Sequence, residues 1–154
     1  MPLMLIAALL LAPPAPSAPL ELASFVKPVV TAYLAGVMKN PPPNAVYLRH
    51  LVVRDSCVLP EHLAVQALSL VTDDSTWGDY APTPYGTHCV LTFEEAGKTV
   101  YVLLGLHNQR AFILHNEHPG TEKILSYRGA VALYSLFEEV FPGLDAQYPG
   151  LPVP

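Results

Sequence analysis

The chain has 154 residues, of which 51% are apolar and 14% are charged, and its net charge is −5. This composition excludes a disordered protein, which is poor in apolar residues, and a nucleic-acid-binding protein, which carries a basic patch. No apolar run reaches the roughly 18–20 residues of a membrane-spanning helix, and two cysteines are too few for a disulfide-stapled miniprotein.

The N-terminus has the form of a secretory signal peptide. Ten residues without a polar side chain, Leu3 to Ala12, are followed by prolines and small residues, which is the order of an apolar region and a cleavage site. Ala15 and Ser17 suit the small-residue positions before a cut. We therefore expect a signal peptide at 1–17, one domain at 18–154 and a secreted or periplasmic location. The alternative is a short hydrophobic arm on a cytosolic protein.

The first element of the mature chain is predicted to be a helix at 20–38. Apolar residues recur there at spacings of three and four: Leu22, Phe25, Val26, Val29, Tyr33 and Val37. Pro28 either begins this helix or kinks it, and the prolines at 41–43 end it.

The next two elements are predicted to be a strand and a helix. Residues 46–54 are rich in β-branched and aromatic side chains, which favour a strand. Residues 60–72 predict a helix, since Pro60 is tolerated in the first turn and one stripe is apolar: Leu63, Ala67, Leu68 and Val71.

Cys57 and Cys89 are the two cysteines of the chain. In an exported protein, such a pair most simply forms one disulfide, which would stabilise the fold by about 3–4 kcal/mol. The alternative is two buried free thiols that pack as small hydrophobic side chains. We expect the disulfide.

An aromatic and proline-rich loop at 77–86 contains Trp77, Tyr80 and Tyr85. Aromatic side chains with a polar tip are frequent hot spots of binding surfaces, and proline lowers the entropy cost of holding a loop in place. The sequence therefore predicts that these three residues contact another protein. The alternative is a lid that packs its rings over the core.

Three strand patterns with short turns between 87 and 115 predict an antiparallel meander. A turn at 95–98 sets only apolar residues opposite each other: Phe93 and Val100, Leu91 and Val102, and Cys89 and Leu104. A two-residue turn at Asn108–Gln109 then pairs Leu104 with Ile113. One face of the meander is apolar throughout and requires a helical cover: Cys89, Leu91, Phe93, Val100, Val102, Leu104, Leu106, Ala111 and Ile113.

The last helix is predicted at 121–141, with Thr121 as its N-cap and Pro142 directly after its end. The order of elements predicts an α+β fold. In this fold an antiparallel sheet of about four strands packs against the helices. Its parts are the three-stranded meander 87–115, the strand 46–54, and the helices 20–38, 60–72 and 121–141.

Histidine and cysteine supply the candidates for chemistry. His115 and His118 lie close together, but Pro119 directly after them predicts a turn in place of the helical zinc-binding motif. His88 and Cys89 are adjacent on a strand and point to opposite faces, so His88 is a poor base for that thiol. The chain has no nucleophile elbow and no phosphate-binding glycine motif. We expect no cofactor and no bound metal.

These observations together predict an exported protein-binding module without catalytic activity, such as an inhibitor, an immunity-type protein or a periplasmic accessory factor. Its partner would be another protein, with no role for nucleic acid or a stable membrane span. The alternative is a small enzyme or ligand carrier whose pocket lies between sheet and helices and is lined by His88, Tyr101, His107 and Arg110. Retention of a ligand after purification would favour the alternative.

Overall fold

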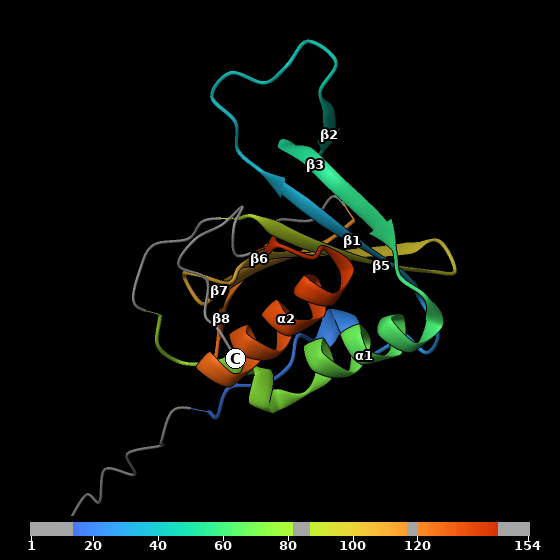
Figure 1. The fold of residues 1–154 in the computed structure, drawn as a ribbon. Coiled ribbons are helices and arrows are strands. Elements are labelled where there is room, and N and C mark those ends of the chain that lie inside the picture. The colour runs from blue at the N-terminus through green and yellow to red at the C-terminus, as the bar shows by residue number, and fades with distance from the viewer. Residues whose placement is uncertain (1–13, 82–86, 117–119, 145–154) are drawn as a thin grey trace, which may run out of the picture.

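The computed structural model describes residues 14–81, 87–116 and 120–144. Within these residues, eight strands form one antiparallel sheet, and two helices lie on one of its faces (Figure 1). The predicted α+β class is confirmed, but the sheet has eight strands in place of about four. The elements are η1 (Leu20–Leu22), β1 (Val29–Gly36), β2 (Val46–Leu48), β3 (Leu51–Val58), α1 (Glu61–Thr72), η2 (Asp74–Thr76), β4 (Trp77–Gly78), β5 (Cys89–Glu95), β6 (Lys98–Gly105), β7 (Arg110–His115), β8 (Thr121–Leu125) and α2 (Tyr127–Val140).

The strands follow the order β2-β3-β1-β5-β6-β7-β8-β4 across the sheet. From β3 near one edge, the chain passes through α1 to β4 at the opposite edge and then returns to β5 in the middle. Strands β5 to β8 form a meander, and α2 follows it directly. No helix in the described part of the chain is both long enough and apolar enough to span a lipid bilayer.

The helix predicted at 20–38 is wrong, because most of that segment is strand β1. Only the short 3₁₀ turn η1 precedes it, and β1 lies between β3 and β5. Val30, Ala32 and Leu34 are 1–2% exposed, with partly or largely exposed residues between them. Tyr33 and Ala35 belong to the apolar cluster on the opposite face of the sheet, so the alternation of β1 was hidden by a pattern that also fits a helix.

The strand predicted at 46–54 is two strands joined by a turn. Leu48 pairs with Leu51, so Arg49 and His50 form a two-residue hairpin turn between β2 and β3. Arg49 has a φ of 55°, a conformation that a non-glycine residue rarely adopts. The helix predicted at 60–72 is confirmed as α1.

The meander is confirmed, and the first hairpin has the predicted register, with Phe93 opposite Val100 and Cys89 opposite Leu104. The second hairpin is shifted by two residues, because Leu104 pairs with Ala111 and not with Ile113. A four-residue connection between Gly105 and Arg110 replaces the predicted two-residue turn. A shift of two preserves the faces of a strand, so the same side chains still face the helices.

The helix predicted at 121–141 starts too early. Residues 121–125 form strand β8, which pairs with β7 on one side and with β4 on the other. The N-cap of α2 is Ser126, whose Oγ accepts a hydrogen bond from the backbone N–H of Gly129 at 2.9 Å. Thr121 is therefore a strand residue and not a cap.

The core lies between the sheet and the two helices. All nine meander residues that were predicted to need a helical cover belong to it, and each is at most 2% exposed. A second, smaller cluster lies on the far face of the sheet, which carries no helix in the described residues. Its buried members are Ala35, Leu51, Val90, Leu103 and Leu114.

Candidate contact surface on a projecting arm

Trp77, one of the three residues of the aromatic loop predicted to contact a partner, is buried in the structure. Trp77 is 3% exposed, belongs to the core, and donates a hydrogen bond from Nε1 to the carbonyl oxygen of Val71 at 3.1 Å. Its ring therefore covers the core, as the alternative expected, and cannot touch a partner. Tyr80 is 75% exposed and stays available for contact. Tyr85 lies outside the described residues.

The predicted disulfide is wrong, since Cys57 and Cys89 are both free thiols. Cys57 pairs with Ala32 on one side of β1, while Cys89 pairs with Leu34 on the other side. Two strand spacings of about 4.8 Å separate the two strands, whereas bridged cysteines have Cα atoms at most about 7 Å apart. The two thiols fit the alternative of small side chains packed in the core.

The pocket expected between sheet and helices is not formed by its four predicted residues. Tyr101 packs against the cluster on the far face, and alternation along β7 sets Arg110 on that face as well. His88 lies just before β5, and His107 lies in the turn after β6. Burial lowers the pKa of His88 to about 4, with a smaller contribution from the charge of His107.

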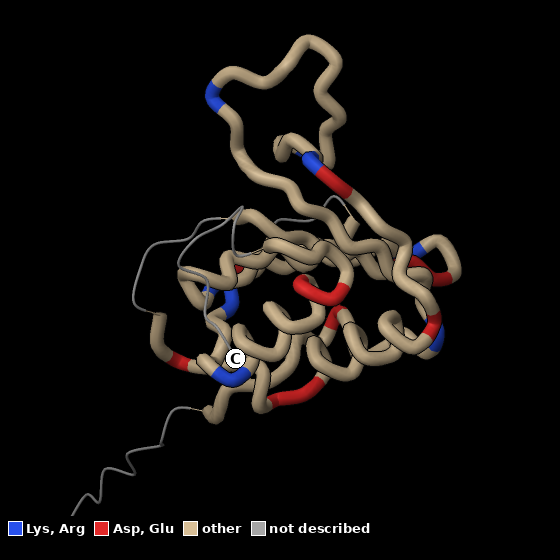
Figure 2. Tube along the Cα trace, in the orientation of Figure 1, with Lys and Arg blue, Asp and Glu red and all other residues tan. Residues whose placement is uncertain are grey.

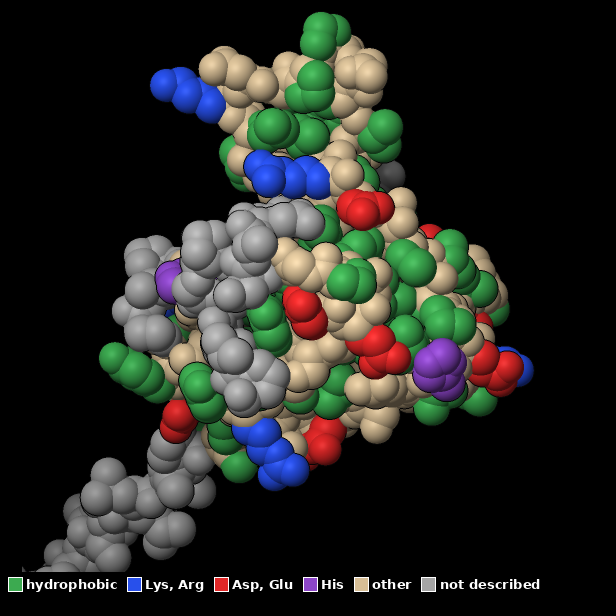
Figure 3. Space-filling view, in the orientation of Figure 1, with side chains coloured by type: hydrophobic (Ala, Val, Ile, Leu, Met, Phe, Trp, Pro, Cys, Tyr) green, Lys and Arg blue, Asp and Glu red, His purple; other side chains and the backbone are tan. Residues whose placement is uncertain are grey.

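Residues 37–50, between β1 and β3, form a segment that projects from the body and is called the arm here (Figure 1). Large apolar side chains gather on it and face solvent (Figure 3): Val37 is 77% exposed, Met38 37%, Val46 66% and Tyr47 54%. Three consecutive prolines stand at its tip. Exposed apolar side chains gathered on a projecting segment make the arm a candidate contact surface.

The base of the arm is fixed to the far face of the sheet by Arg49. Its guanidinium carbon lies 4.8 Å from the centre of the Tyr101 ring, and its Nη2 donates a hydrogen bond to the carbonyl oxygen of Asn116. Leu48 and Leu51, on either side of the turn, pack against the far-face cluster. The arm therefore starts from an ordered base.

The arm also differs from the helical side of the molecule in charge. It carries Lys39 and Arg49 and has no carboxylate. The helical side is rich in carboxylates (Figure 2); those in and beside α1 and α2 are Glu61, Asp73, Asp74, Glu138 and Glu139. The arm is thus better matched by a partner whose surface is apolar and carries carboxylates than by a partner with a basic surface.

A hollow of about 340 Å³ lies beside the base of the arm, on the far face of the sheet. Its floor is apolar, and its edge carries Arg49, His50 and Glu122. Glu122 also accepts a hydrogen bond from Arg110. This hollow is at the lower end of the volumes of small-molecule sites.

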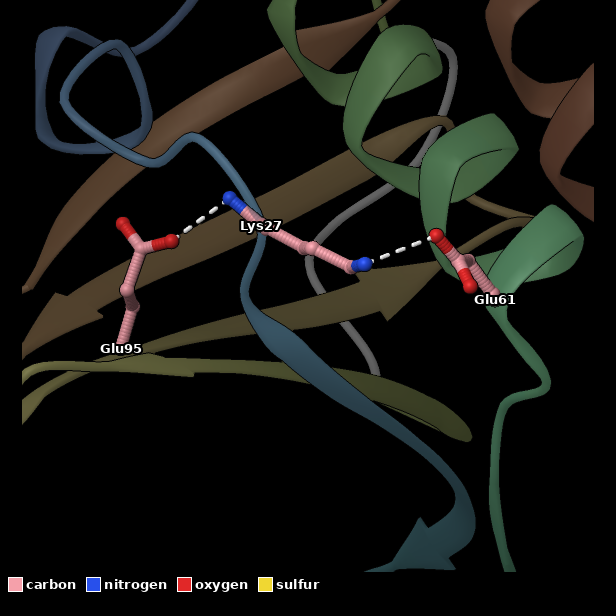
Figure 4. A network of polar contacts seen from close by, with 3 residues as sticks. All are labelled: Lys27, Glu61 and Glu95. Atoms are coloured by element: carbon pink, nitrogen blue, oxygen red, sulfur yellow. Dashed lines mark hydrogen bonds and ion pairs between the residues drawn. The ribbon is translucent and has the colours of Figure 1, made fainter.

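A second apolar hollow, of about 300 Å³, lies where β1, β3 and α1 meet. Four valines that line it are largely exposed: Val26 at 86%, Val29 at 56%, Val58 at 64% and Val65 at 61%. A polar network borders it (Figure 4). The backbone N–H of Lys27 donates to Glu95 at 2.6 Å, and the ammonium of Lys27 lies 2.9 Å from the carboxylate of Glu61.

On the exposed edge of β3, one backbone N–H is already bonded to a side chain of the same strand. Beyond the three residues that pair with β2, strand β3 has β1 as its only strand neighbour. There the backbone N–H of Ser56 donates to Oδ1 of Asp55 at 2.8 Å. The opposite edge is β4, which is two residues long.

Among the described residues, no group of three or more histidine, cysteine or carboxylate side chains is placed to hold a metal ion. Comparison with protein-family models, with curated proteins and with solved structures found no significant match for this chain. Functional conclusions therefore depend on the chemistry of its own surface. The arm was missed at the sequence level, because Val37 and Met38 were assigned to a helix and the turn at Arg49 and His50, which makes β2 a short edge strand, was not recognised.

Proposed function

We propose that this protein is an exported protein-binding module and that the arm is its contact surface. The observation that carries the proposal is the set of exposed apolar side chains on a projecting segment whose base is ordered. The contacts of Arg49 with Tyr101 and Asn116 at the base limit the conformational freedom that the arm can lose when it binds. Tyr47 combines a large apolar ring with a polar tip, as hot-spot residues do.

Export is part of the same proposal. The apolar run from Leu3 to Ala12 and the small residues after it support a signal peptide at 1–17 and a secreted or periplasmic location. A protein partner in that compartment would meet the arm with an apolar surface that carries carboxylates, since the arm has cations and no acidic residue.

Two exposed tyrosines allow a matched test of the contact surface. Tyr47 lies on the arm and Tyr80 on the aromatic loop, and they are 54% and 75% exposed. A partner is first isolated from native extract with the wild-type domain as bait. We then expect Tyr47→Ala to weaken its binding at least about tenfold, the effect of a hot-spot residue, and Tyr80→Ala to leave it unchanged. The reverse result would move the contact surface to the aromatic loop.

A ligand carrier is the second candidate, supported by the hollow beside the base of the arm. Leu103, Phe112 and Leu114 give it an apolar floor, and Arg49 gives it a cation at the edge, so it suits a small apolar anion. Native mass spectrometry of the purified protein tests this. An added mass that is lost in Leu103→Trp, which fills the hollow, would favour the carrier, whereas the bare protein mass would favour the binding module.

A further inference from the structure

The described chain changes from exposed to packed at one peptide bond. Residues 14–17 are exposed and have no regular secondary structure, whereas Ala18 packs against the core and Pro19 is buried. Leu22, in the turn that follows, is fully buried. The bond between Ser17 and Ala18 thus lies where a peptidase can reach the chain without opening the core. It is also the bond at which the sequence predicts cleavage of the signal peptide.

The backbone nitrogen of Ala18 donates a hydrogen bond to Oδ1 of Asp74 at 2.8 Å. Asp74 begins η2, which is 56 residues further along the chain. The neighbouring carboxylate of Asp73 is occupied differently, because it accepts from the backbone N–H of Ser75 at 2.8 Å. Asp74 is therefore the carboxylate that accepts the hydrogen bond from the backbone nitrogen of Ala18, where the packed chain begins.

We propose that removal of the signal peptide creates an ion pair between the new N-terminus and Asp74, which fastens the start of the mature chain to the body. This inference rests on the export part of the proposed function. A peptidase of the export pathway hydrolyses the Ser17–Ala18 bond: water supplies the hydroxyl of the new Ser17 carboxyl group and a proton for the Ala18 nitrogen. The resulting α-amino group, with an ordinary pKa of about 7.7–8.0, takes up a further proton at neutral pH.

Cleavage thereby turns a hydrogen bond from a neutral amide into one from an ammonium. Hydrogen bonds with an ionised donor or acceptor are stronger than neutral ones. The acceptor here is already a carboxylate, so cleavage adds the charge of the donor and a Coulomb attraction between the two groups. Four other charged side chains lie around the two partners: Glu21 and Lys123 with Ala18, and Asp73 and Arg128 with the start of η2. Their charges are balanced in sign, so Asp74 decides the interaction with the new ammonium.

The interaction has a predictable pH dependence. The carboxylate favours the charged form of the ammonium, so the pKa of the α-amino group is higher in the folded protein than in the unfolded chain. Its stabilisation is present in full below about pH 7.7, the ordinary pKa, and is lost as the pH rises through the folded pKa.

The experiment uses the exported protein, whose intact mass first establishes its N-terminal residue. Its thermal midpoint is measured before and after enzymatic acetylation of the N-terminus, which removes the charge and keeps an N–H donor. We expect acetylation to lower the midpoint by about 2–4 °C at pH 7 and to have no effect at pH 10. In Asp74→Asn acetylation should change nothing at either pH, whereas Asp79→Asn, a matched change at an exposed aspartate, should behave as wild type.

The outcomes separate this inference from the proposed function. An exported protein that begins at Ala18 but has the same midpoint with and without acetylation would overturn the ion pair and leave export standing. Equal effects of acetylation in wild type and Asp74→Asn would also overturn it. A mass that begins at Met1 or at any residue other than Ala18 would overturn the ion pair, and Met1 would overturn export as well.

Discussion

Arg49 and Tyr101 connect the arm to the far face of the sheet, with the guanidinium carbon 4.8 Å from the centre of the ring. The contact joins a hairpin turn near one edge of the sheet to β6 in its middle. Arg49 adopts a φ of 55°, which costs about 1–2 kcal/mol for a residue other than glycine. We expect the contacts of the side chain to offset this cost.

Replacing Arg49 tests this balance. Arg49→Gly removes a cation–π contact of about 0.5–1 kcal/mol and a hydrogen bond from a charged donor of about 1.5–3 kcal/mol, and it relieves the backbone strain. We expect a net loss of about 1 kcal/mol in the free energy of unfolding, measured in urea, and faster proteolysis within the arm. His50→Ala, at the neighbouring exposed position of the turn, is the control and should show neither change.

The turn between β5 and β6 offers a stabilising substitution. Ala96 and Gly97 have φ values of 50° and 77°, as in the two-residue turn that favours Asn-Gly. Ala96→Asn should raise the free energy of unfolding by about 0.5–1 kcal/mol, since asparagine tolerates this conformation better than alanine. Gly97→Ala should lower it by a similar amount. Chemical denaturation of both variants checks the assignment, and a destabilised Ala96→Asn would contradict it.

Gly129 is required by a close approach of backbone to backbone. A Cβ atom at this position would lie 2.2 Å from the carbonyl oxygen of Thr76, which belongs to η2 and cannot rotate away. Gly129→Ala should therefore lower the free energy of unfolding by about 3 kcal/mol, the upper range for overpacking. Ser135→Ala, on the exposed side of the same helix, should change it by less than about 0.5 kcal/mol.

The two cysteines should differ in reactivity. Burial raises the pKa of the Cys89 thiol, so little of the reactive thiolate forms, while Cys57 is partly exposed. We expect iodoacetamide to add one group to the native protein, on Cys57, and two groups after denaturation, as seen by mass spectrometry. Resistance of both thiols in the denatured, unreduced protein would reveal a disulfide and contradict the structure.

His88 should make the fold sensitive to acid. Burial holds its pKa at about 4 in the folded protein, whereas the unfolded chain has an ordinary value of about 6.5. Between these values the unfolded state binds more protons, so stability falls as the pH falls, by up to about 3 kcal/mol at pH 4. In His88→Gln the loss between pH 6.5 and 4 should be smaller by that amount. Parallel urea titrations of both proteins at several pH values measure it.

Local patterns predicted the parts of the fold that depend on neighbours in sequence. The first hairpin has the predicted register because Phe93, Leu91 and Cys89 face only apolar partners in one alignment. The α1 helix was found because its apolar stripe and its first-turn proline agree. In α1 one face alone meets the core, so its hydrophobic periodicity is unambiguous. The hairpin is largely buried on both faces, so its short turn and its apolar pairs, and not its alternation, indicate the register.

The remaining elements depend on contacts between distant segments. β1 is a strand because β3 and β5 lie on both sides of it, and nothing in its own sequence distinguishes that setting from a helix. Residues 121–125 form a strand because β7 and β4 pair with them. Ser126 was the one local signal that could have corrected the start of α2, since serine is a preferred N-cap.

The proposed contact surface was missed because of these errors. With β1 read as a helix that ran to residue 38, Val37 was assigned to its apolar stripe and Met38 to its last turn. In the structure the strand ends at Gly36, and the chain leaves the body there. Trp77 was predicted as a contact residue for a different reason. An aromatic side chain suits a hot spot and a core equally well, and only the contacts of Trp77 with α1 and β8 decide between the two.

The carboxylate of Asp55 has a consequence for how this protein can meet others. It accepts a hydrogen bond from the backbone N–H of Ser56. The exposed edge of β3 therefore lacks one of the donors that an added strand would need. The far rim of the sheet, at β4, is too short to serve as a template. Addition of a foreign strand at these two places is thus disfavoured. The contact that we propose for the arm would then depend on side chains, which is the kind of specificity that point substitutions can retune.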